Sequence, residues 1–148
     1  MGVTCKLGGP TPWQPNETVL HEQRHFRAVS STCLPSYRIA FQMPPLLRLT
    51  LYVTNRRVQV VSRMFGCLTQ EIDLWYPPHL PADRTETVTG VAVTRGLFGP
   101  CLELRSRDPR RRQRWLWSPD LTLRFFFANP ERVERIIREA MRSSGDSR

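Results

Sequence analysis

The chain has 148 residues, of which 40% are hydrophobic and 24% are charged, and its formal net charge is +9 at pH 7. These values are typical of one globular domain that can bury a core without help from metals or disulfides. The positive charge favours anionic partners, and acidic lipid and nucleic acid both qualify. No window approaches eighteen consecutive apolar residues, so no transmembrane helix is predicted. The four cysteines stand alone, without the paired spacing of a zinc site, and fit a reducing cytoplasm.

The N-terminal part of the chain is rich in glycine and proline. Residues 1–16 are therefore predicted to form a flexible leader, and they lack the apolar region that a signal peptide needs. We expect a single domain over residues 17–142 and a flexible tail over residues 143–148. Residues 17–31 are ambiguous between strand and helix, whereas residues 36–43 indicate a short strand that ends at the prolines behind it.

The middle of the chain alternates between apolar and polar residues, which is the signature of half-buried strands. Turn signals separate these segments, and the stretch 76–86 contains three prolines and is predicted to be a loop. Strands bounded by turns in this way favour a closed or sandwiched antiparallel sheet. The predicted strands are 46–54, 57–65, 67–75, 87–96 (with a bulge at Gly90), 101–107, 113–118 and 121–127.

The C-terminal segment follows a different pattern and predicts an amphipathic helix over residues 129–142. Asn129 is a good N-cap, Pro130 suits the first helical position, and Gly145 lies just past the expected end. A single helix with one apolar stripe must bury that stripe, and the open end of a small β-barrel is the expected place. The stripe consists of Val133, Ile136, Ile137, Ala140 and Met141.

The order of these elements resembles the pleckstrin-homology (PH) superfold, in particular the bacterial PH-like domains and more distantly the GRAM domains. The resemblance covers roughly residues 47–142. It implies an α+β, mostly β fold, namely a bent antiparallel sheet or partly open barrel of about seven or more strands capped by one C-terminal helix. It implies binding and no enzymatic role. The segments that carry it are Thr54-Asn55-Arg56-Arg57 with the following Gly66, Glu71 and Ile72, then "RGLFGPCLELRSR" (95–107) and "NPERVERIIREA" (129–140).

The hairpin tip raises a specific question. Tight hairpins favour Asn-Gly because both central residues need positive φ, yet Asn55 is followed here by two arginines. The resemblance implies that this hairpin meets lipid phosphates, so Arg56, Arg57 and Arg63 would form an anion cradle. Arginine suits this role because its planar fork binds phosphate bidentately.

The alternative is that the tip is structural. Asn55 would then bond its own backbone, and an arginine would pair with a carboxylate such as Glu71 or Asp73. We expect a division of labour between the two arginines. Arg56 should point to solvent and contact the ligand, whereas Arg57 should lie along the sheet and contribute to stability.

A second basic cluster lies at residues 105–114, where a hairpin tip is predicted next to Trp115 and Trp117. A basic tip beside aromatic residues suits an anionic membrane interface. It also suits single-stranded nucleic acid, or a solvated loop that protects a sheet edge. We expect this cluster and the hairpin tip to project from the same end of the sheet. Its arginines are Arg105, Arg107, Arg110, Arg111, Arg112 and Arg114, against the single acidic residue Asp108.

The stretch "HEQRH" at residues 21–25 fits the zinc-peptidase pattern. That chemistry needs His21 and His25 on one helical face, Glu22 as general base, and a third ligand from a later element. The flanking residues make no clean helical stripe, and no second helix is predicted before residue 129. Incidental surface histidines without a metal are therefore the preferred interpretation.

The sequence as a whole predicts a non-enzymatic module without cofactor or metal. Its expected ligand is an anionic phospholipid headgroup, met from the cytoplasm at the inner face of the cytoplasmic membrane. The alternative is a protein-interaction scaffold of the same fold, in which an exposed strand edge or the groove beside the helix takes a peptide. Nucleic-acid binding and a zinc peptidase are more distant alternatives.

Overall fold

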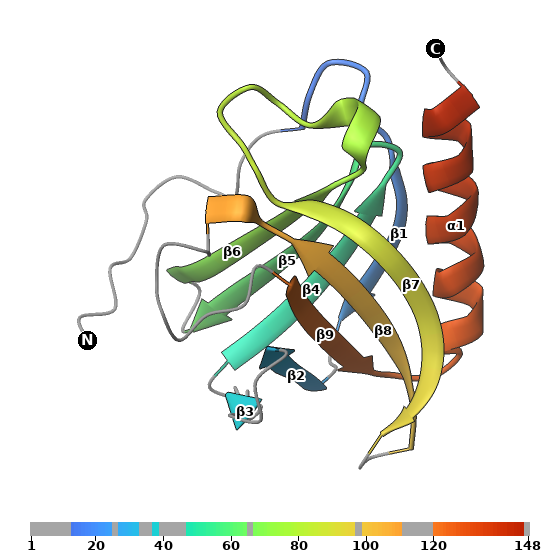
Figure 1. Ribbon diagram of the computed structural model, residues 1–148. Helices are drawn as coiled ribbons and strands as arrows, with labels where there is room; N and C mark the ends of the chain where they lie inside the picture. Colours follow the sequence, from blue (N-terminus) through green and yellow to red (C-terminus); the bar gives the residue numbers. More distant parts are fainter. Residues whose placement is uncertain are drawn as a thin grey trace.

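In the computed structural model (Figure 1), strands surround the core and one helix packs along their side. The structure describes residues 13–24, 27–32, 37–38, 47–64, 67–96, 99–110 and 120–146. The strands are β1 (Val19–Arg24), β2 (Arg27–Thr32), β3 (Tyr37–Arg38), β4 (Leu47–Thr54), β5 (Arg57–Met64), β6 (Cys67–Trp75), β7 (Thr87–Gly96), β8 (Gly99–Arg107) and β9 (Asp120–Phe126). The helices are the short 3-10 helix η1 (Pro77–His79) and the α-helix α1 (Pro130–Asp146).

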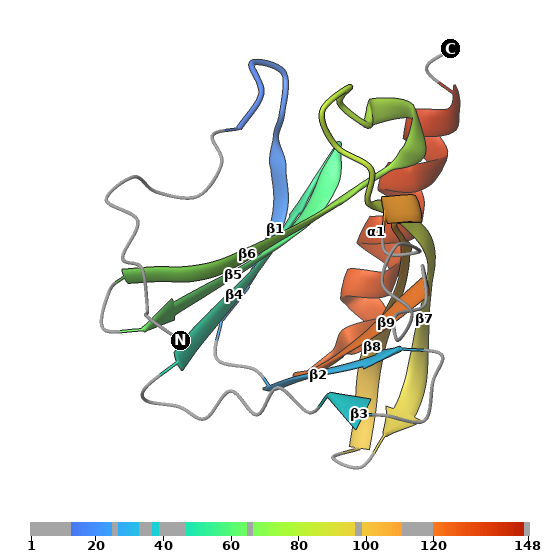
Figure 2. The same cartoon turned by 60° about the vertical axis from the view of Figure 1, so that its left-hand side comes forward.

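The strands form one bent sheet in the order β1-β4-β5-β6-β7-β8-β9-β2-β3. Neighbours are antiparallel except β6 and β7, which meet in parallel at the pair Trp75 and Thr87. On either side of this junction the sheet divides into two layers that diverge, as Figure 2 shows. Because β1 pairs with β4 and the next strand, β2, pairs with β9, the chain spans both layers. The predicted fold class, a partly open barrel capped by one helix, is confirmed.

The strands between residues 47 and 107 lie where the alternation of the sequence predicts them. The expected bulge is also present, since the β7–β8 register shifts between Val88 and Gly90. The ambiguous stretch at residues 17–31 forms strands, because β4 and β9 supply hydrogen-bonding partners for it. Of the strand expected at residues 36–43 the structure describes Tyr37–Arg38, and the one expected at residues 113–118 lies outside the described residues.

The core lies between the two layers and α1. On the helix, Val133, Ile137 and Ala140 are buried, while Ile136 and Met141 are half-buried against the core. The cap role of the helix is therefore confirmed, and Ile137 is its deepest residue. The exposed face carries arginines, namely Arg132, Arg135 and Arg142. The strands contribute Leu49, Leu51, Val53, Val58, Val60, Leu74, Val88, Val91, Leu102, Leu104, Leu123 and Phe125 to the core.

The helix is longer than the sequence predicts, because it continues through Gly145 to Asp146. Ser144 explains the extra turn. Its hydroxyl is buried, donates to the carbonyl of Ala140 at 2.8 Å, and lies 3.1 Å from the ring of His79 on η1. The predicted tail boundary at residue 143 is therefore wrong for residues 143–146, which belong to the helix. At the other end Asn129 has a φ of 57°, in the left-handed region that asparagine tolerates.

The last residues of the predicted leader belong to the folded domain. Trp13 meets the ring of Tyr52 edge to face, with 5.4 Å between the centroids. The carbonyl of Asn16 accepts a hydrogen bond from the side chain of Asn55 at 3.1 Å. The predicted boundary at residue 16 is therefore wrong for residues 13–16, which pack on β4 and its hairpin. Residues 1–12 lie outside the described part of the chain.

Candidate functional site

One row of paired residues fixes which loops share an end of the sheet. Arg57 pairs with Trp75, Trp75 with Thr87, and Thr87 with Arg107. Three strand spacings of about 4.8 Å separate their backbones along the bent sheet, so Arg57 and Arg107 lie at most roughly 14 Å apart. The two basic turns therefore project from the same end, as predicted. We call it the tip end; it comprises residues 54–57, 76–86 and 107–110.

The turn between β4 and β5 needs no glycine because a threonine side chain holds it. Thr54 Oγ1 accepts hydrogen bonds from the backbone N–H groups of Arg56 at 3.1 Å and Arg57 at 3.0 Å. Neither Asn55 nor Arg56 adopts positive φ; within the described ranges the non-glycine residue that does is Asn129. The turn therefore departs from the usual Asn-Gly hairpin geometry, and Thr54 supplies its hydrogen bonds.

Asn55 bridges the turn to the segment that precedes β1. Its Oδ1 accepts from the N–H of Thr18 at 2.8 Å, and its Nδ2 donates to the carbonyl of Asn16. Its own N–H donates to the carbonyl of Thr18 at 3.1 Å. The predicted bond from the Asn55 side chain to its own backbone is thus replaced by a tertiary contact, which fixes the N-terminal segment to the hairpin.

Arg57 lies at the centre of a buried ion cluster. Its side chain is 0% exposed, and it donates to both Glu17 oxygens at 3.0 and 3.2 Å and to Asp73 Oδ1 at 3.1 Å. The guanidinium lies between two indole rings, 5.1 Å from the centroid of Trp13 and 4.7 Å from that of Trp75. Such burial prevents contact with a headgroup in the folded state. The predicted ligand role of Arg57 is therefore corrected to the structural one.

The ion cluster contains more carboxylates than guanidinium groups. Asp73 is the partner of Arg57 that the sequence suggested, whereas Glu71 accepts from Gln59 Nε2 at 2.6 Å. Burial and the neighbouring charge of Glu71 raise the pKa of Asp73 to about 6, although Arg57 opposes this shift. Removing these groups from water favours the neutral form of one carboxyl, because a single guanidinium cannot compensate for all of them.

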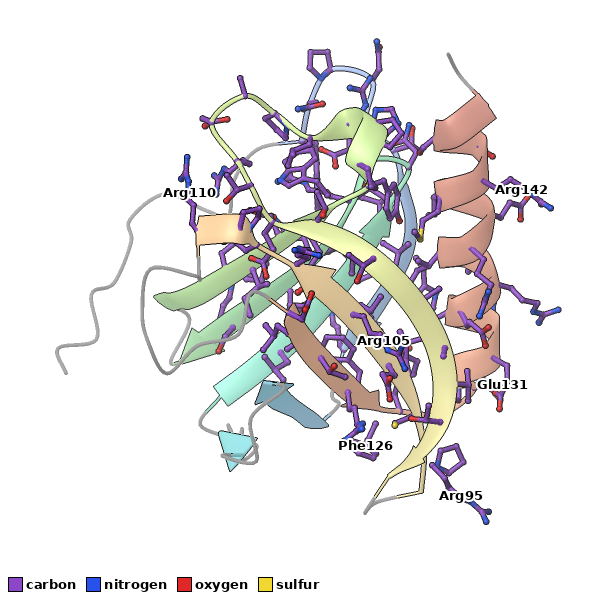
Figure 3. All side chains as sticks on the ribbon, in the orientation of Figure 1. Arg95, Arg105, Arg110, Phe126, Glu131 and Arg142 are labelled. Atoms are coloured by element: carbon purple, nitrogen blue, oxygen red, sulfur yellow. The ribbon has the colours of Figure 1, made fainter. Side chains whose placement is uncertain are left out.

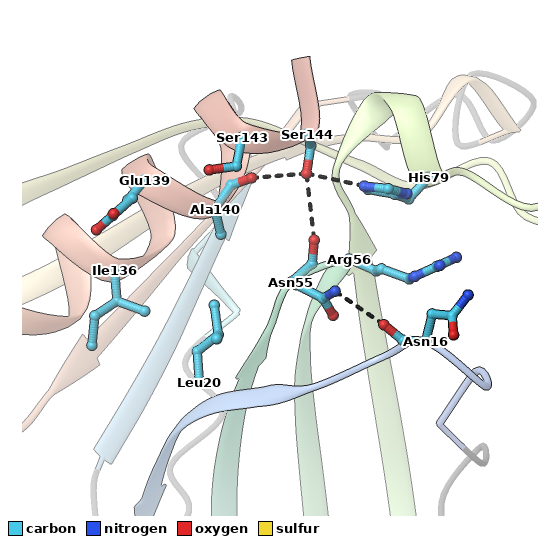
Figure 4. A pocket seen from close by; sticks show the side chains of 10 residues that line it. All are labelled: Asn16, Leu20, Asn55, Arg56, His79, Ile136, Glu139, Ala140, Ser143 and Ser144. Carbon is cyan, nitrogen blue, oxygen red and sulfur yellow. Dashed lines mark hydrogen bonds between the residues drawn. The ribbon is translucent and has the colours of Figure 1, made fainter. Parts of the chain in front are cut away.

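Arg56 is half-buried, contrary to the expectation that it points to solvent. Its Nη1 donates to Gln14 Oε1 at 2.7 Å. It lines a pocket of about 720 Å³ between the hairpin, η1 and the last turns of α1, shown in Figure 4. His79 and Leu20 line the same pocket, and burial, together with the charge of Arg56, lowers the pKa of His79. The pocket is thus polar near Arg56 and apolar near Leu20 and Ile136.

His79 and Ser144 are close in this pocket. The Ser144 hydroxyl lies within hydrogen-bonding distance of the carbonyl oxygens of Ala140 at 2.8 Å and Asn55 at 3.4 Å and of His79 Nε2 at 3.1 Å. The contact therefore anchors the C-terminal turn of α1 to η1.

The remaining predicted site residues fall into four groups. Arg107 and Arg110 are exposed at the tip end, where Figure 3 shows Arg110 projecting from the turn. Arg63 is half-exposed and lies six residues along β5 from Arg57, about 20 Å away, so it cannot complete a cradle with the tip. Arg105 pairs with Glu103 at 3.1 Å. Arg111, Arg112, Arg114, Trp115 and Trp117 lie outside the described residues.

Asp108 orders the second basic turn. Its Oδ1 accepts from the Thr85 hydroxyl at 2.6 Å and from the backbone N–H of Arg110 at 3.0 Å. The turn is therefore tied to the proline-rich loop beside it. This contact leaves the Arg107 and Arg110 side chains exposed.

Exposed apolar side chains lie at the tip end and on the N-terminal segment beside it, a feature that the sequence analysis did not predict. Val19 pairs with Thr54 at the base of the hairpin turn, Leu20 lines the pocket beside Arg56, and Leu80 follows η1. The sequence held one signal: consecutive apolar residues at the start of a strand face opposite sides, so one of Val19 and Leu20 is expected to face outward. The exposed fractions are 38% for Trp13, 40% for Val19, 44% for Leu20 and 37% for Leu80.

The zinc-peptidase pattern does not take the required form in the described residues. His21 and Glu22 lie on strand β1, where neighbouring side chains point to opposite faces, and residue 25 lies outside the described part. Within the described ranges, no group of three histidine, cysteine or acidic residues is placed to hold a metal.

Comparison of the chain with protein-family models, with curated proteins and with solved structures finds no match. The assignment to the bacterial PH-like domains stays a prediction from the resemblance.

Proposed function

We propose that the protein is a non-enzymatic binding module of the PH-like type that recognises anionic membrane surfaces through its tip end. The carrying observation is the row of paired residues Trp75, Thr87 and Arg107, which brings the exposed basic turn after β8 to the same end of the sheet as the proline-rich loop and the exposed apolar side chains beside the β4–β5 turn. A membrane is a plane, so charges can act on it together only when they project from one end of the molecule.

The charges that support this proposal are the exposed ones. Arg84, Arg107 and Arg110 are exposed on adjacent segments of the tip end. The sequence continues directly from Arg110 with Arg111 and Arg112, which add to the positive charge of the same segment. Each basic residue close to an acidic membrane contributes about 1 kcal/mol, so a few such arginines suffice for reversible binding.

The exposed apolar residues at this end favour a membrane over a purely solvated surface. Val19, Leu20 and Leu80 are large side chains that a solvated surface does not require. Beside arginines they suit the boundary between headgroups and acyl chains, where the charges meet phosphates and the apolar groups leave water. No helix in the described part is long and apolar enough to cross a bilayer. The proposed binding is peripheral, at the inner face of the cytoplasmic membrane.

Vesicle sedimentation tests this proposal. The full chain should pellet with acidic vesicles and not with neutral ones, and the binding should weaken as salt is added. The triple variant Arg110→Ser, Arg111→Ser and Arg112→Ser should lose about 1–3 kcal/mol of binding free energy. Its unfolding free energy should change by less than about 0.5 kcal/mol, because surface arginines contribute little to stability.

A matched control removes the same charge from another face. Arg132, Arg135 and Arg142 are exposed on α1, and their triple serine variant should bind acidic vesicles like the parent. Equal losses in the two variants would mean that net charge alone drives adsorption. A parent protein that ignores acidic vesicles would refute the proposal and favour a protein-interaction role.

A further inference from the structure

Strand β7 has one paired edge and one open edge. On one side it pairs with β8 from Thr87 to Gly96. On the other side its pairing within the described residues is the single contact between Thr87 and Trp75. The N–H and C=O groups of one residue point to the same side of a strand. At the start of β7 the carbonyl of Glu86 points to this side and accepts from the N–H of Trp75 at 3.2 Å, and the bulge between Val88 and Gly90 shifts the alternation beyond it.

Helix α1 turns this edge into a groove. The helix runs beside β7, as Figure 1 shows, and a groove of about 650 Å³ separates residues 89–91 of the strand from the middle of the helix. Met141 contributes apolar surface to it, and Gly90 leaves it without a side chain at the bulge. A volume of about 650 Å³ can hold a few residues of an extended peptide beside β7.

One contact identifies which residues face the groove. Arg138 Nη2 donates to the carbonyl of Val91 at 2.8 Å, so Val91 and, two residues on, Val93 point their backbone groups to the open edge. Arg138 is 58% exposed and also pairs with Glu134 at 2.6 Å. An exposed ion pair of this kind is weak. Because water can solvate the exposed guanidinium when it leaves Val91, a backbone N–H of an incoming strand can take its place at this carbonyl.

The charge of the groove selects its occupant. Arg135, Arg138 and Arg142 line it, against the single acidic lining residue Glu139. From Arg138 to Arg142 the helix rises about 6 Å, close to the roughly 6.8 Å between alternate residues of a strand. Alternate acidic side chains of an added strand would thus face successive arginines. Arg138 would give up its hydrogen bond to the carbonyl of Val91 and bind a carboxylate of the peptide instead.

We propose that the groove between β7 and α1 binds an extended acidic peptide segment by strand addition to the open edge of β7. Backbone hydrogen bonds to Val91 and Val93 give affinity, and the arginines of α1 give preference for acidic sequences. This site lies away from the tip end and does not depend on membrane binding.

The test titrates the isotope-labelled full chain with a blocked peptide of alternating glutamate and valine and follows the backbone amides by NMR. The amides of residues 88–95 should shift, and a lysine–valine peptide of equal length should leave them unchanged. The double variant Arg135→Ser and Arg142→Ser should weaken binding about tenfold. The control double variant Arg84→Ser and Arg132→Ser removes equal charge outside the groove and should bind within about twofold of the parent.

A backbone variant tests strand addition itself. Val93→Pro removes an N–H that points to the open edge, a position where a strand tolerates proline. The variant should lose peptide binding without a lower melting temperature. Should this variant fail to fold, the arginine double variant decides alone. Absence of shifts in β7, equal binding of the lysine peptide, or shifts in β7 produced by acidic vesicles and not by the peptide would each overturn the proposal.

Discussion

The two basic turns of the tip end look alike in sequence and differ completely in structure. Arg57 and Arg107 stand in the same row of paired residues, each at the end of a strand beside a turn. Arg57 is fully buried between two indoles and two carboxylates, whereas Arg107 is exposed. The difference shows that the position of an arginine at a hairpin does not decide its role. Its partners decide whether it is buried in the core or stays exposed and able to bind a ligand.

The partners of Arg57 come from far away in the chain. Glu17 lies forty residues before it and Asp73 sixteen residues after it. The segment carrying Trp13 and Glu17 covers the hairpin tip, and the Thr54 hydroxyl donates to Glu17 Oε2 at 2.8 Å. Thus the turn between β4 and β5 has been incorporated into the core, and the turn after β8 is the surface-exposed one.

The largest expected effect is the loss of the buried guanidinium. Arg57→Ala should lower the unfolding free energy by about 3–5 kcal/mol, because Glu17 and Asp73 would stay buried without their counter-ion. Chemical denaturation measures it. Arg57→Lys keeps the charge but loses the planar fork that bridges the two carboxylates, and it should fall between parent and alanine. A change below 1 kcal/mol for Arg57→Ala would show that the cluster is readily hydrated and not part of the core.

The next effect concerns the threonine that holds the turn. Thr54→Val keeps the shape of the side chain but removes the acceptor for two backbone N–H groups and the donor to Glu17. We expect a loss of about 1–3 kcal/mol in unfolding free energy. The exposed Thr89→Val is the control and should stay within about 0.5 kcal/mol. Equal values for both would mean that water replaces the Thr54 hydroxyl.

The pH dependence of stability sharpens the same comparison. The pKa of Asp73 is about 6 in the folded protein and close to 3.8 in the unfolded chain, so the folded state binds this proton more tightly. Its contribution to stability is therefore full below about pH 4 and declines as the pH rises to about 6, by roughly 1–2 kcal/mol. The parent should show this decline relative to Asp73→Asn in denaturation at several pH values. A parent that gains stability over this range relative to the variant would show that Arg57 holds the pKa of Asp73 in the folded protein below its value in the unfolded chain.

The smallest expected effect is at the exposed turn. Arg107→Ala should change the unfolding free energy by less than about 0.5 kcal/mol, because water already solvates its charge. Melting temperatures of the Arg107 and Arg57 variants measured side by side give the contrast directly. A large loss at Arg107 would place this residue in a stabilising cluster and weaken its proposed role at a membrane.

The sequence by itself determined the strands from residue 47 to residue 107, the bulge at Gly90 and the helix that caps the core. Periodicity suffices there, because one face of each element is buried and the spacing of apolar residues reports that face. It also indicated that Arg57 would be the structural arginine, since alternation along β5 puts its side chain against the sheet.

Only the tertiary structure decided the fate of the individual polar groups. Neither the pairing of Glu17 with Arg57 nor the link from Asn16 to Asn55 leaves a local pattern, because the partners are about forty residues apart. The length of α1 depends likewise on Ser144 reaching His79, a contact across 65 positions. The open edge of β7 follows from β6 and β7 diverging after one pair. Periodicity records which face of an element is buried, whereas partner choice depends on which distant segments the fold brings within hydrogen-bonding distance.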